Sequence, residues 1–109
     1  GLDVTGQCQI PAERLRRALD KKAGPLAATK PMADIWFANS PAAVLHDPLA
    51  AAVIFEPGLC DYDLVTVAPD QGLTMIDHEK QGGDHRVATD VRAERFVEHF
   101  LGTIDALAD

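Results

Sequence analysis

The chain has few basic residues: its 109 residues include 10 Lys and Arg against 17 Asp and Glu, a formal net charge of −7. Proteins that bind nucleic acid or anionic membranes need clustered Lys and Arg side chains. The one basic cluster, Arg14, Arg16 and Arg17, stands beside Glu13 and Asp20 and is typical of a solvated helix face. We therefore expect neither nucleic acid nor a membrane as a partner.

Long hydrophobic runs and paired cysteines are also missing. No apolar run approaches the roughly 18–20 residues that span a bilayer, and the N-terminus lacks the basic-then-apolar pattern of a signal peptide. Cys8 and Cys60 are far apart and form no Cys-x-x-Cys motif. We expect two reduced, half-buried thiols in a cytoplasmic protein, with a disulfide between them as the alternative.

Common activity motifs are absent too. The chain has no P-loop, no Gly-x-Gly-x-x-Gly, no Gly-x-Ser-x-Gly and no His-Glu-x-x-His. The sequence therefore lacks the usual motifs for nucleotide binding through a phosphate cradle and for zinc-dependent proteolysis.

What is present predicts one compact segment over residues 1–109, of mixed α/β class. We expect a strand end at residues 1–5, and helices after Pro11, from about Thr29 to Asn39, and over the apolar residues 48–55, the last buried on most sides. A small sheet of about three short strands is expected at residues 63–68, 73–78 and 85–91. Apolar residues at helical spacing over 93–107 predict a long amphipathic C-terminal helix.

The most informative polar pair is His46-Asp47, just before the apolar helix. Asp47 is followed by Pro48 and suits an N-cap, and His46 could be a loop histidine that bonds a backbone group. Alternatively, a proton donor and a carboxylate beside an apolar helix suit a hard cation with an acid nearby. One carboxylate is too little for calcium, which takes about 6–8 oxygens.

Other candidate sites are weaker. A divalent metal could bind a second polar cluster, although solvated turns are the more common role for such residues: Asp77, His78, Glu79, Asp84 and His85. The aromatic pair Trp36-Phe37 could stack on a planar base, although aromatic residues in an apolar helix usually belong to the core. A metal phosphohydrolase would need further spaced histidines beside His46-Asp47, and these are missing.

Two motifs resemble a known family. The sequence HDPLA at residues 46–50, preceded by GLDVT at residues 1–5 and followed by an apolar helix and Pro-Gly-Leu, resembles the C-terminal part of inosine-uridine-preferring nucleoside hydrolases. The later runs LVTV, GLTMID and VATDV occur in the matching order, so the resemblance spans essentially the whole chain.

The resemblance implies an α/β enzyme that hydrolyses the N-glycosidic bond of purine or pyrimidine ribonucleosides to ribose and free base. A bound Ca²⁺ would hold the ribose diol and the attacking water. His46 would protonate the departing base, and Asp47 would be a calcium ligand.

The family's Asp-x-Asp-x-x-x-Asp-Asp run, which supplies the other metal carboxylates and the water-activating base, is missing from these 109 residues. The family's Asn- and Glu-containing ribose contacts are missing too. We therefore expect about the last third of an enzyme, inactive by itself, with an incomplete calcium site that holds no ion alone. Base preference and homo-oligomerisation stay open. The alternative is a non-catalytic α/β module that pairs with another chain through residues 1–5 and 48–55.

Overall fold

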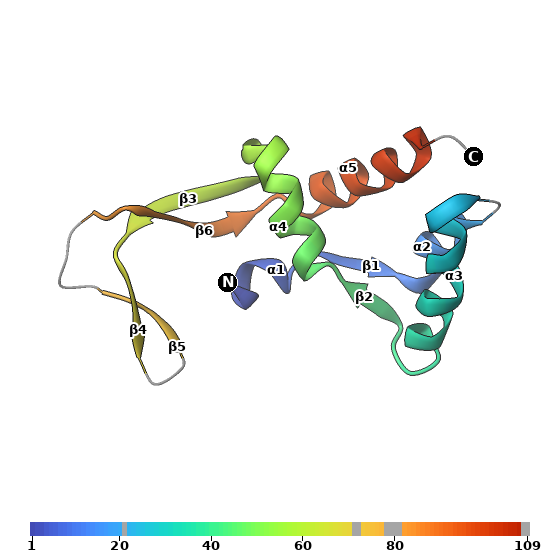
Figure 1. Cartoon of the computed structure of the whole chain (residues 1–109), viewed down its shortest axis with the longest axis horizontal. Coiled ribbons are helices and arrows are strands. Elements are labelled where there is room, and N and C mark those ends of the chain that lie inside the picture. Colours follow the sequence, from blue (N-terminus) through green and yellow to red (C-terminus); the bar gives the residue numbers. More distant parts are fainter. Residues whose placement is uncertain (21, 71–72, 78–81, 108–109) are drawn as a thin grey trace.

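The computed structural model describes residues 1–20, 22–70, 73–77 and 82–107 (Figure 1). The helices are α1 (Leu2–Thr5), α2 (Ala12–Leu19), α3 (Gly24–Phe37), α4 (His46–Phe55), a 3-10 turn η1 (Pro57–Leu59) and α5 (Ala93–Ala106). The strands are β1 (Gln9–Pro11), β2 (Ala42–Val44), β3 (Cys60–Val65), β4 (Val67–Asp70), β5 (Leu73–Ile76) and β6 (His85–Val91). The mixed α/β class is thereby confirmed.

The strands form three antiparallel pairs: β1 with β2, β3 with β6, and β4 with β5. The predicted strand at residues 63–68 is in fact divided at Thr66 between the β3–β6 ribbon and the β4–β5 hairpin. The β3–β6 ladder contains an irregularity between Asp61 and Tyr62. Part of the predicted strand at 73–78 lies outside the described residues.

The prediction of a strand end at residues 1–5 is wrong, because these residues form the helical turn α1. The backbone N–H groups of Thr5 and Gly6 donate to the carbonyl oxygens of Gly1 and Leu2, at 3.1 and 2.9 Å. Val4 points into the core and is only 1% exposed. The chain therefore satisfies its first backbone groups locally and anchors them through one buried side chain.

The second predicted helix begins earlier than expected, at Gly24 instead of Thr29. Gly24 has a φ of 59°, a left-handed conformation that glycine adopts without strain. Pro25 follows in the first turn, where its missing N–H costs nothing. Pro31 consequently lies inside α3 instead of at its start.

One hydrophobic core joins α1, α2, α4, α5 and the inner ends of β3 and β6. It is composed of Val4, Cys8, Ile10, Leu15, Leu19, Leu45, Leu49, Leu59, Cys60, Val91, Phe96, Val97 and Ile104. The amphipathic C-terminal helix is confirmed as α5, which buries Phe96, Val97 and Ile104. The prediction that α4 is buried on most sides is wrong: only Leu49 is buried, whereas Ile54 and Phe55 are 75% and 80% exposed.

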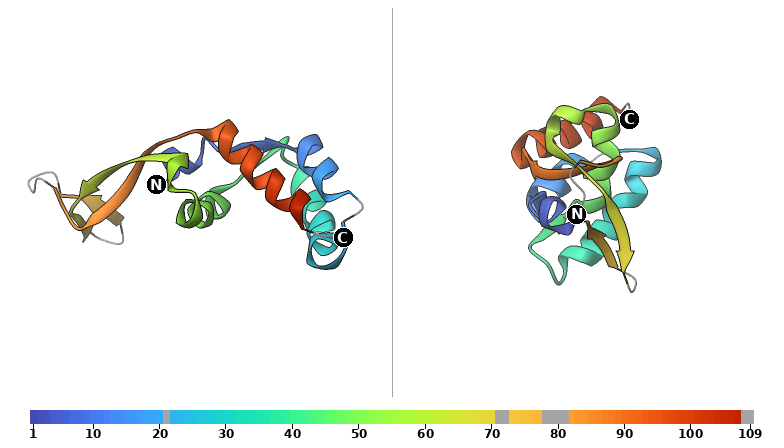
Figure 2. Two further views of the ribbon diagram at one scale, coloured as in Figure 1. Left: turned by 90° about the horizontal axis from the view of Figure 1, so that it is seen from above. Right: turned by 90° about the vertical axis from the view of Figure 1, so that its left-hand side faces the viewer.

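The described chain is elongated. Its radius of gyration is 16.6 Å and its extents are 52 × 28 × 22 Å, whereas a compact domain of this length has a radius near 13 Å. The β3–β6 ribbon and the β4–β5 hairpin extend away from the helices, and α2 and α3 lie at the opposite end (Figures 1 and 2). The accessible surface of 7495 Å² exceeds that of a compact protein of this mass by roughly 1,600 Å². In the described part of the chain, no helix is long and apolar enough to cross a bilayer.

Candidate functional site

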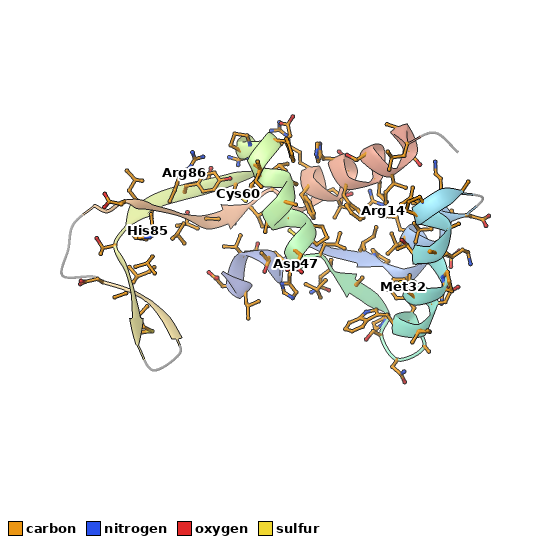
Figure 3. The ribbon with its side chains drawn as sticks, in the orientation of Figure 1. Arg14, Met32, Asp47, Cys60, His85 and Arg86 are labelled. Atoms are coloured by element: carbon orange, nitrogen blue, oxygen red, sulfur yellow. The ribbon has the colours of Figure 1, made fainter. Side chains whose placement is uncertain are left out.

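The start of α4 carries both residues that the sequence singles out. His46 and Asp47 are the first two residues of α4 (Figure 3 labels Asp47). The approach to the helix is fixed, because Leu45 is buried and its N–H donates to the Cys8 carbonyl at 2.8 Å. Antiparallel pairing of Gln9 with Val44 brings the end of β2 next to the start of β1. Residues that follow β2 therefore lie beside residues that precede β1.

This arrangement places His46 against Thr5. Thr5 Oγ1 lies 2.6 Å from His46 Nδ1 in a half-buried contact between residues 41 positions apart. The same Oγ1 lies 3.2 Å from the carbonyl oxygen of Gly1. His46 thus bonds a side chain, and its ring orientation is set by α1. The sequence analysis missed Thr5, although it is the last residue of the GLDVT motif.

The N-cap interpretation of Asp47 is wrong. The helix begins one residue before the Asp-Pro dipeptide, so Leu45 occupies the cap position and no side chain caps the helix. Asp47 lies in the first turn, where its charge still interacts favourably with the helix dipole. Its side chain is exposed, and the carboxylate faces solvent.

A calcium ion does not fit the described residues alone. Asp47 offers two oxygens, whereas Ca²⁺ takes about 6–8. In the described ranges, no group of three or more His, Cys, Asp or Glu side chains lies close enough together to hold a metal. In the second candidate cluster, His78 and Glu79 lie outside the described residues, and Asp84 and His85 are exposed.

The aromatic pair in α3 divides between surface and interior. Trp36 is 56% exposed, and its indole N–H donates to the Ala42 carbonyl at 3.0 Å, which ties α3 to β2. Phe37 packs against the core, with the Arg16 guanidinium 5.3 Å from its ring centroid. The expectation that these aromatic side chains belong to the core is therefore confirmed for Phe37 and wrong for Trp36.

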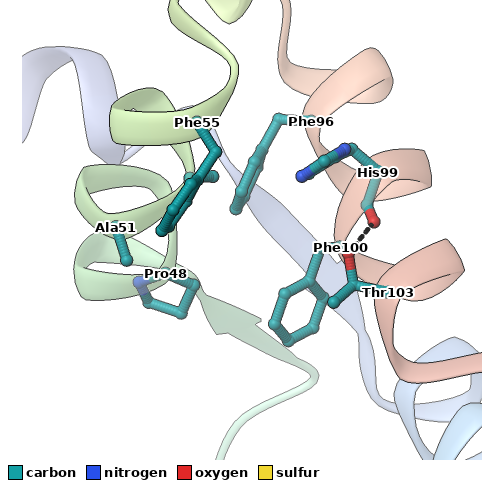
Figure 4. Close-up of a pocket in the computed structure, with 8 residues that line it drawn as sticks. Pro48, Ala51, Phe55, Phe96, His99, Phe100 and Thr103 are labelled. Atoms are coloured by element: carbon teal, nitrogen blue, oxygen red, sulfur yellow. Dashed lines mark hydrogen bonds between the residues drawn. The ribbon is translucent and has the colours of Figure 1, made fainter. Parts of the chain in front are cut away.

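Two hollows flank α4. A cavity of about 210 Å³ adjoins Thr5 and is lined by side chains of α1, α4, β3 and β6, among them Leu49, Val53, Cys60, Tyr62 and Arg86. The Arg86 guanidinium stacks on Tyr62, 4.1 Å from the ring centroid. The second hollow, about 260 Å³, is an apolar groove between α4 and α5 (Figure 4). Its walls include Pro48, Phe55, Phe96 and Phe100, with His99 and Thr103 beside them.

Both cysteines are free thiols and are buried, more deeply than expected. Burial raises the pKa of the Cys8 thiol, and the nearby Cys60 adds to this effect. Burial likewise raises the pKa of Cys60, opposed mainly by a hydrogen bond with Tyr62. The thiols are therefore held in their protonated, unreactive form.

Comparison with known proteins identifies the fold. No protein-family model and no curated protein sequence matches the chain. Among solved structures, the chain is similar to a plant nucleoside hydrolase, with a TM-score of 0.72 and 19% sequence identity. The match covers 98% of this chain and 40% of that chain, so the 109 residues span less than half of that enzyme's length. The 109 residues accordingly adopt part of a nucleoside-hydrolase-like fold.

Proposed function

We propose that this chain is the C-terminal portion of a nucleoside N-ribohydrolase of the inosine-uridine-preferring type. The intact enzyme would cleave the N-glycosidic bond of purine or pyrimidine ribonucleosides, giving ribose and free base. The observation that carries the proposal is the likeness of nearly the whole chain to a nucleoside hydrolase fold. The HDPLA motif at the start of α4 gives this fold its candidate chemistry.

His46 is the proposed acid. As the N-glycosidic bond breaks, positive charge grows on the ribose and negative charge on the base, so a proton donor at the base lowers the barrier. The Thr5 contact occupies Nδ1 of His46 and leaves Nε2 for the substrate. The half-buried ring is shielded enough to hold one orientation and open enough to meet a ligand.

Asp47 is the proposed contribution of this chain to a calcium site. Because the described residues do not form such a site, the remaining carboxylates and the base that activates water would come from polypeptide other than these 109 residues. We therefore propose that the chain alone binds no calcium and has no activity. The buried, protonated thiols suit a cytoplasmic location.

The test begins with the reading frame upstream of the Gly1 codon. The proposal predicts an aspartate-rich Asp-x-Asp-x-x-x-Asp-Asp run after a strand. The protein expressed from that longer frame should release base from inosine or uridine when calcium is present, and His46→Ala should abolish the release. A longer, folded protein that has the run but releases no base would contradict the proposal.

A second candidate function is a non-catalytic module that pairs with another chain. It is favoured by the roughly 1,600 Å² of surface beyond that of a compact protein, about twice what one partner buries in a standard interface. On α1 and α4, where we expect the contact, three large apolar side chains are exposed: Leu2, Ile54 and Phe55. Light scattering after size exclusion of the chain by itself should then detect a stable homo-oligomer at micromolar concentration. A monomer at every concentration would count against the module.

A further inference from the structure

The outer side of α4 is an apolar stripe that begins at Asp47. Residues three or four positions apart share one side of a helix. The stripe consists of exposed residues at this spacing: Asp47, Ala50, Ala51 and Ile54. Leu49 lies on the opposite side of the helix and is 2% exposed within the core. One side of α4 therefore packs on the chain, and the other faces solvent.

The stripe continues into the apolar groove between α4 and α5 (Figure 4). Ala51 belongs to both, and Phe55 lines the groove although it is 80% exposed. Among the described residues that line this space of about 260 Å³, none is Asp, Glu, Lys or Arg. The name α4 face is used below for the groove together with four residues: Ala50, Ala51, Ile54 and Phe55. It is a continuous surface without charge, bordered at one end by Asp47.

The α4 face has the character of an interaction surface. Ile54 and Phe55 are 75% and 80% exposed and stand side by side at the end of the helix. Contiguous exposed apolar surface of this kind marks contact sites on soluble proteins. The small side chains of Ala50 and Ala51 allow another backbone to approach α4 closely. The face therefore suits a partner that presents a complementary apolar surface.

The comparison with the plant nucleoside hydrolase indicates that partner. The match covers 98% of this chain but only 40% of that chain, so most of the fold lies outside these residues. We propose that the α4 face is the docking surface for the remainder of a nucleoside-hydrolase-like fold, carried on the same longer polypeptide. This inference rests on the proposed function, because it takes the chain to be a portion of such an enzyme. The surplus accessible surface of roughly 1,600 Å² supports it, since a piece of a larger fold exposes what the rest covers.

The proposal also places the covering polypeptide beside the candidate site. Ile54 follows Asp47 by seven residues, which is about 10 Å along the helix axis. A segment that packs on Ile54 and Ala50 therefore extends to Asp47 with one further turn of contact. Its chemistry follows from the face: apolar side chains toward residues 50–55 and polar groups toward Asp47. Docking surface and candidate site thus form one continuous interface.

Substitution of Ile54 in two contexts tests the proposal. The longer protein is the one translated from the reading frame that extends upstream of Gly1. Ile54→Lys should change the melting temperature of the 109-residue chain by no more than about 4 °C, as at other exposed positions. In the longer protein it should lower the melting temperature by at least about 6 °C, because a buried, unpaired charge is strongly destabilising. The matched control, Ile54→Leu, keeps the face apolar and should stay within about 4 °C in both.

A cross-link identifies the occupant directly. With p-benzoylphenylalanine in place of Phe55, irradiation of the longer protein should couple this position to a peptide outside residues 1–109, identified by mass spectrometry. Three results would overturn the proposal: equal effects of Ile54→Lys in both contexts, a cross-link confined to residues 1–109, or a reading frame that encodes no further polypeptide. A dimer of the 109-residue chain that Ile54→Lys dissociates would assign the face to a second copy and would overturn it as well.

Failure of the proposed function is visible separately, because neither measurement uses a substrate. A longer protein that passes both tests but releases no base would contradict the hydrolase and leave the docking surface intact. Base release from a longer protein whose stability ignores Ile54→Lys would contradict the docking surface alone. If Ile54→Lys prevents the longer protein from folding while Ile54→Leu folds, this is the loss expected at a covered position, and the cross-link still identifies what covers it.

Discussion

The Arg16 guanidinium donates to the Asp34 carboxylate at 2.7 Å and thereby joins α2 to α3. Lys30 reaches the other carboxylate oxygen of Asp34 at 3.2 Å from within α3. In α3 itself no residue is fully buried. Polar contacts at the α2–α3 boundary therefore matter more for this helix than they would for a helix with a buried face.

Stability should depend on pH through Asp34. Its hydrogen bond with Arg16, and then that with Lys30, holds the pKa of the Asp34 carboxyl below its usual value. A lowered folded-state pKa gives stability that is present above the unfolded pKa, near 4, and is lost as the pH falls through the folded value. Thermal unfolding between about pH 6 and pH 2 should show a smaller acid-induced loss in Asp34→Asn than in the unmodified chain.

The exposed carboxylate of Asp20 supplies the control for this experiment. Asp20→Asn should keep the acid dependence of the unmodified chain. Equal acid dependence in Asp34→Asn and the unmodified chain would show that the Arg16 contact does not act on folding.

Two phenylalanines of the α4–α5 groove should differ sharply in their contribution to stability. Phe96 is 0% exposed and Phe55 is 80% exposed. Phe96→Ala should lower the free energy of unfolding by about 3–5 kcal/mol, since it opens a cavity in the core. Phe55→Ala should change it by about 0.5 kcal/mol or less, as is usual on a surface. Urea unfolding measures both, and similar losses for the two variants would contradict the described burial.

The buried thiols should react slowly. Because burial raises the pKa of both Cys8 and Cys60, little thiolate forms at pH 7–8, given an ordinary thiol value near 8.5. A maleimide dye should label both residues within minutes in urea and far more slowly in buffer. The raised pKa values also mean that stability falls as the pH rises beyond about 8.5, where only the unfolded chain ionises readily. Rapid native labelling would contradict the burial.

The isolated chain should not hydrolyse nucleosides. With calcium and inosine or uridine, we expect no base above the uncatalysed background, because Asp47 alone cannot supply the metal site. Chromatography of the free base measures this. Release of base that His46→Ala abolishes would overturn the expectation that the chain is inactive alone.

Local patterns predicted the elements whose partners are close in sequence. The apolar spacing around Phe96 and Ile104 identifies α5, because an amphipathic helix carries its own evidence of which face is buried. The same logic failed for α4: residues that are apolar all round indicate burial, but Ile54 and Phe55 are exposed. What covers such a face depends on polypeptide outside the helix, and the apolar pattern does not contain that information.

Non-local contacts account for the other misses. The β3–β6 ribbon pairs Val65 with His85, across a hairpin that itself contains a β-pair, so short-range sequence patterns could not reveal it. Thr5 was missed as part of the site because it meets His46 across 41 positions. His46 and Asp47 stood out in the sequence as a polar pair before an apolar helix, but Asp47 took a different helix position from the one that local capping rules predict.

We propose that this chain contributes an acid, His46, to a nucleoside hydrolase of which it forms only a part. The most direct measurement is base release by a chimera in which this chain replaces the matching 40% of the plant nucleoside hydrolase. Circular dichroism and size exclusion would first establish that the chimera folds. We predict calcium-dependent release of base that falls at least about 100-fold in His46→Ala, the range of general acid catalysis. Undiminished release from the folded His46→Ala chimera would contradict the claim.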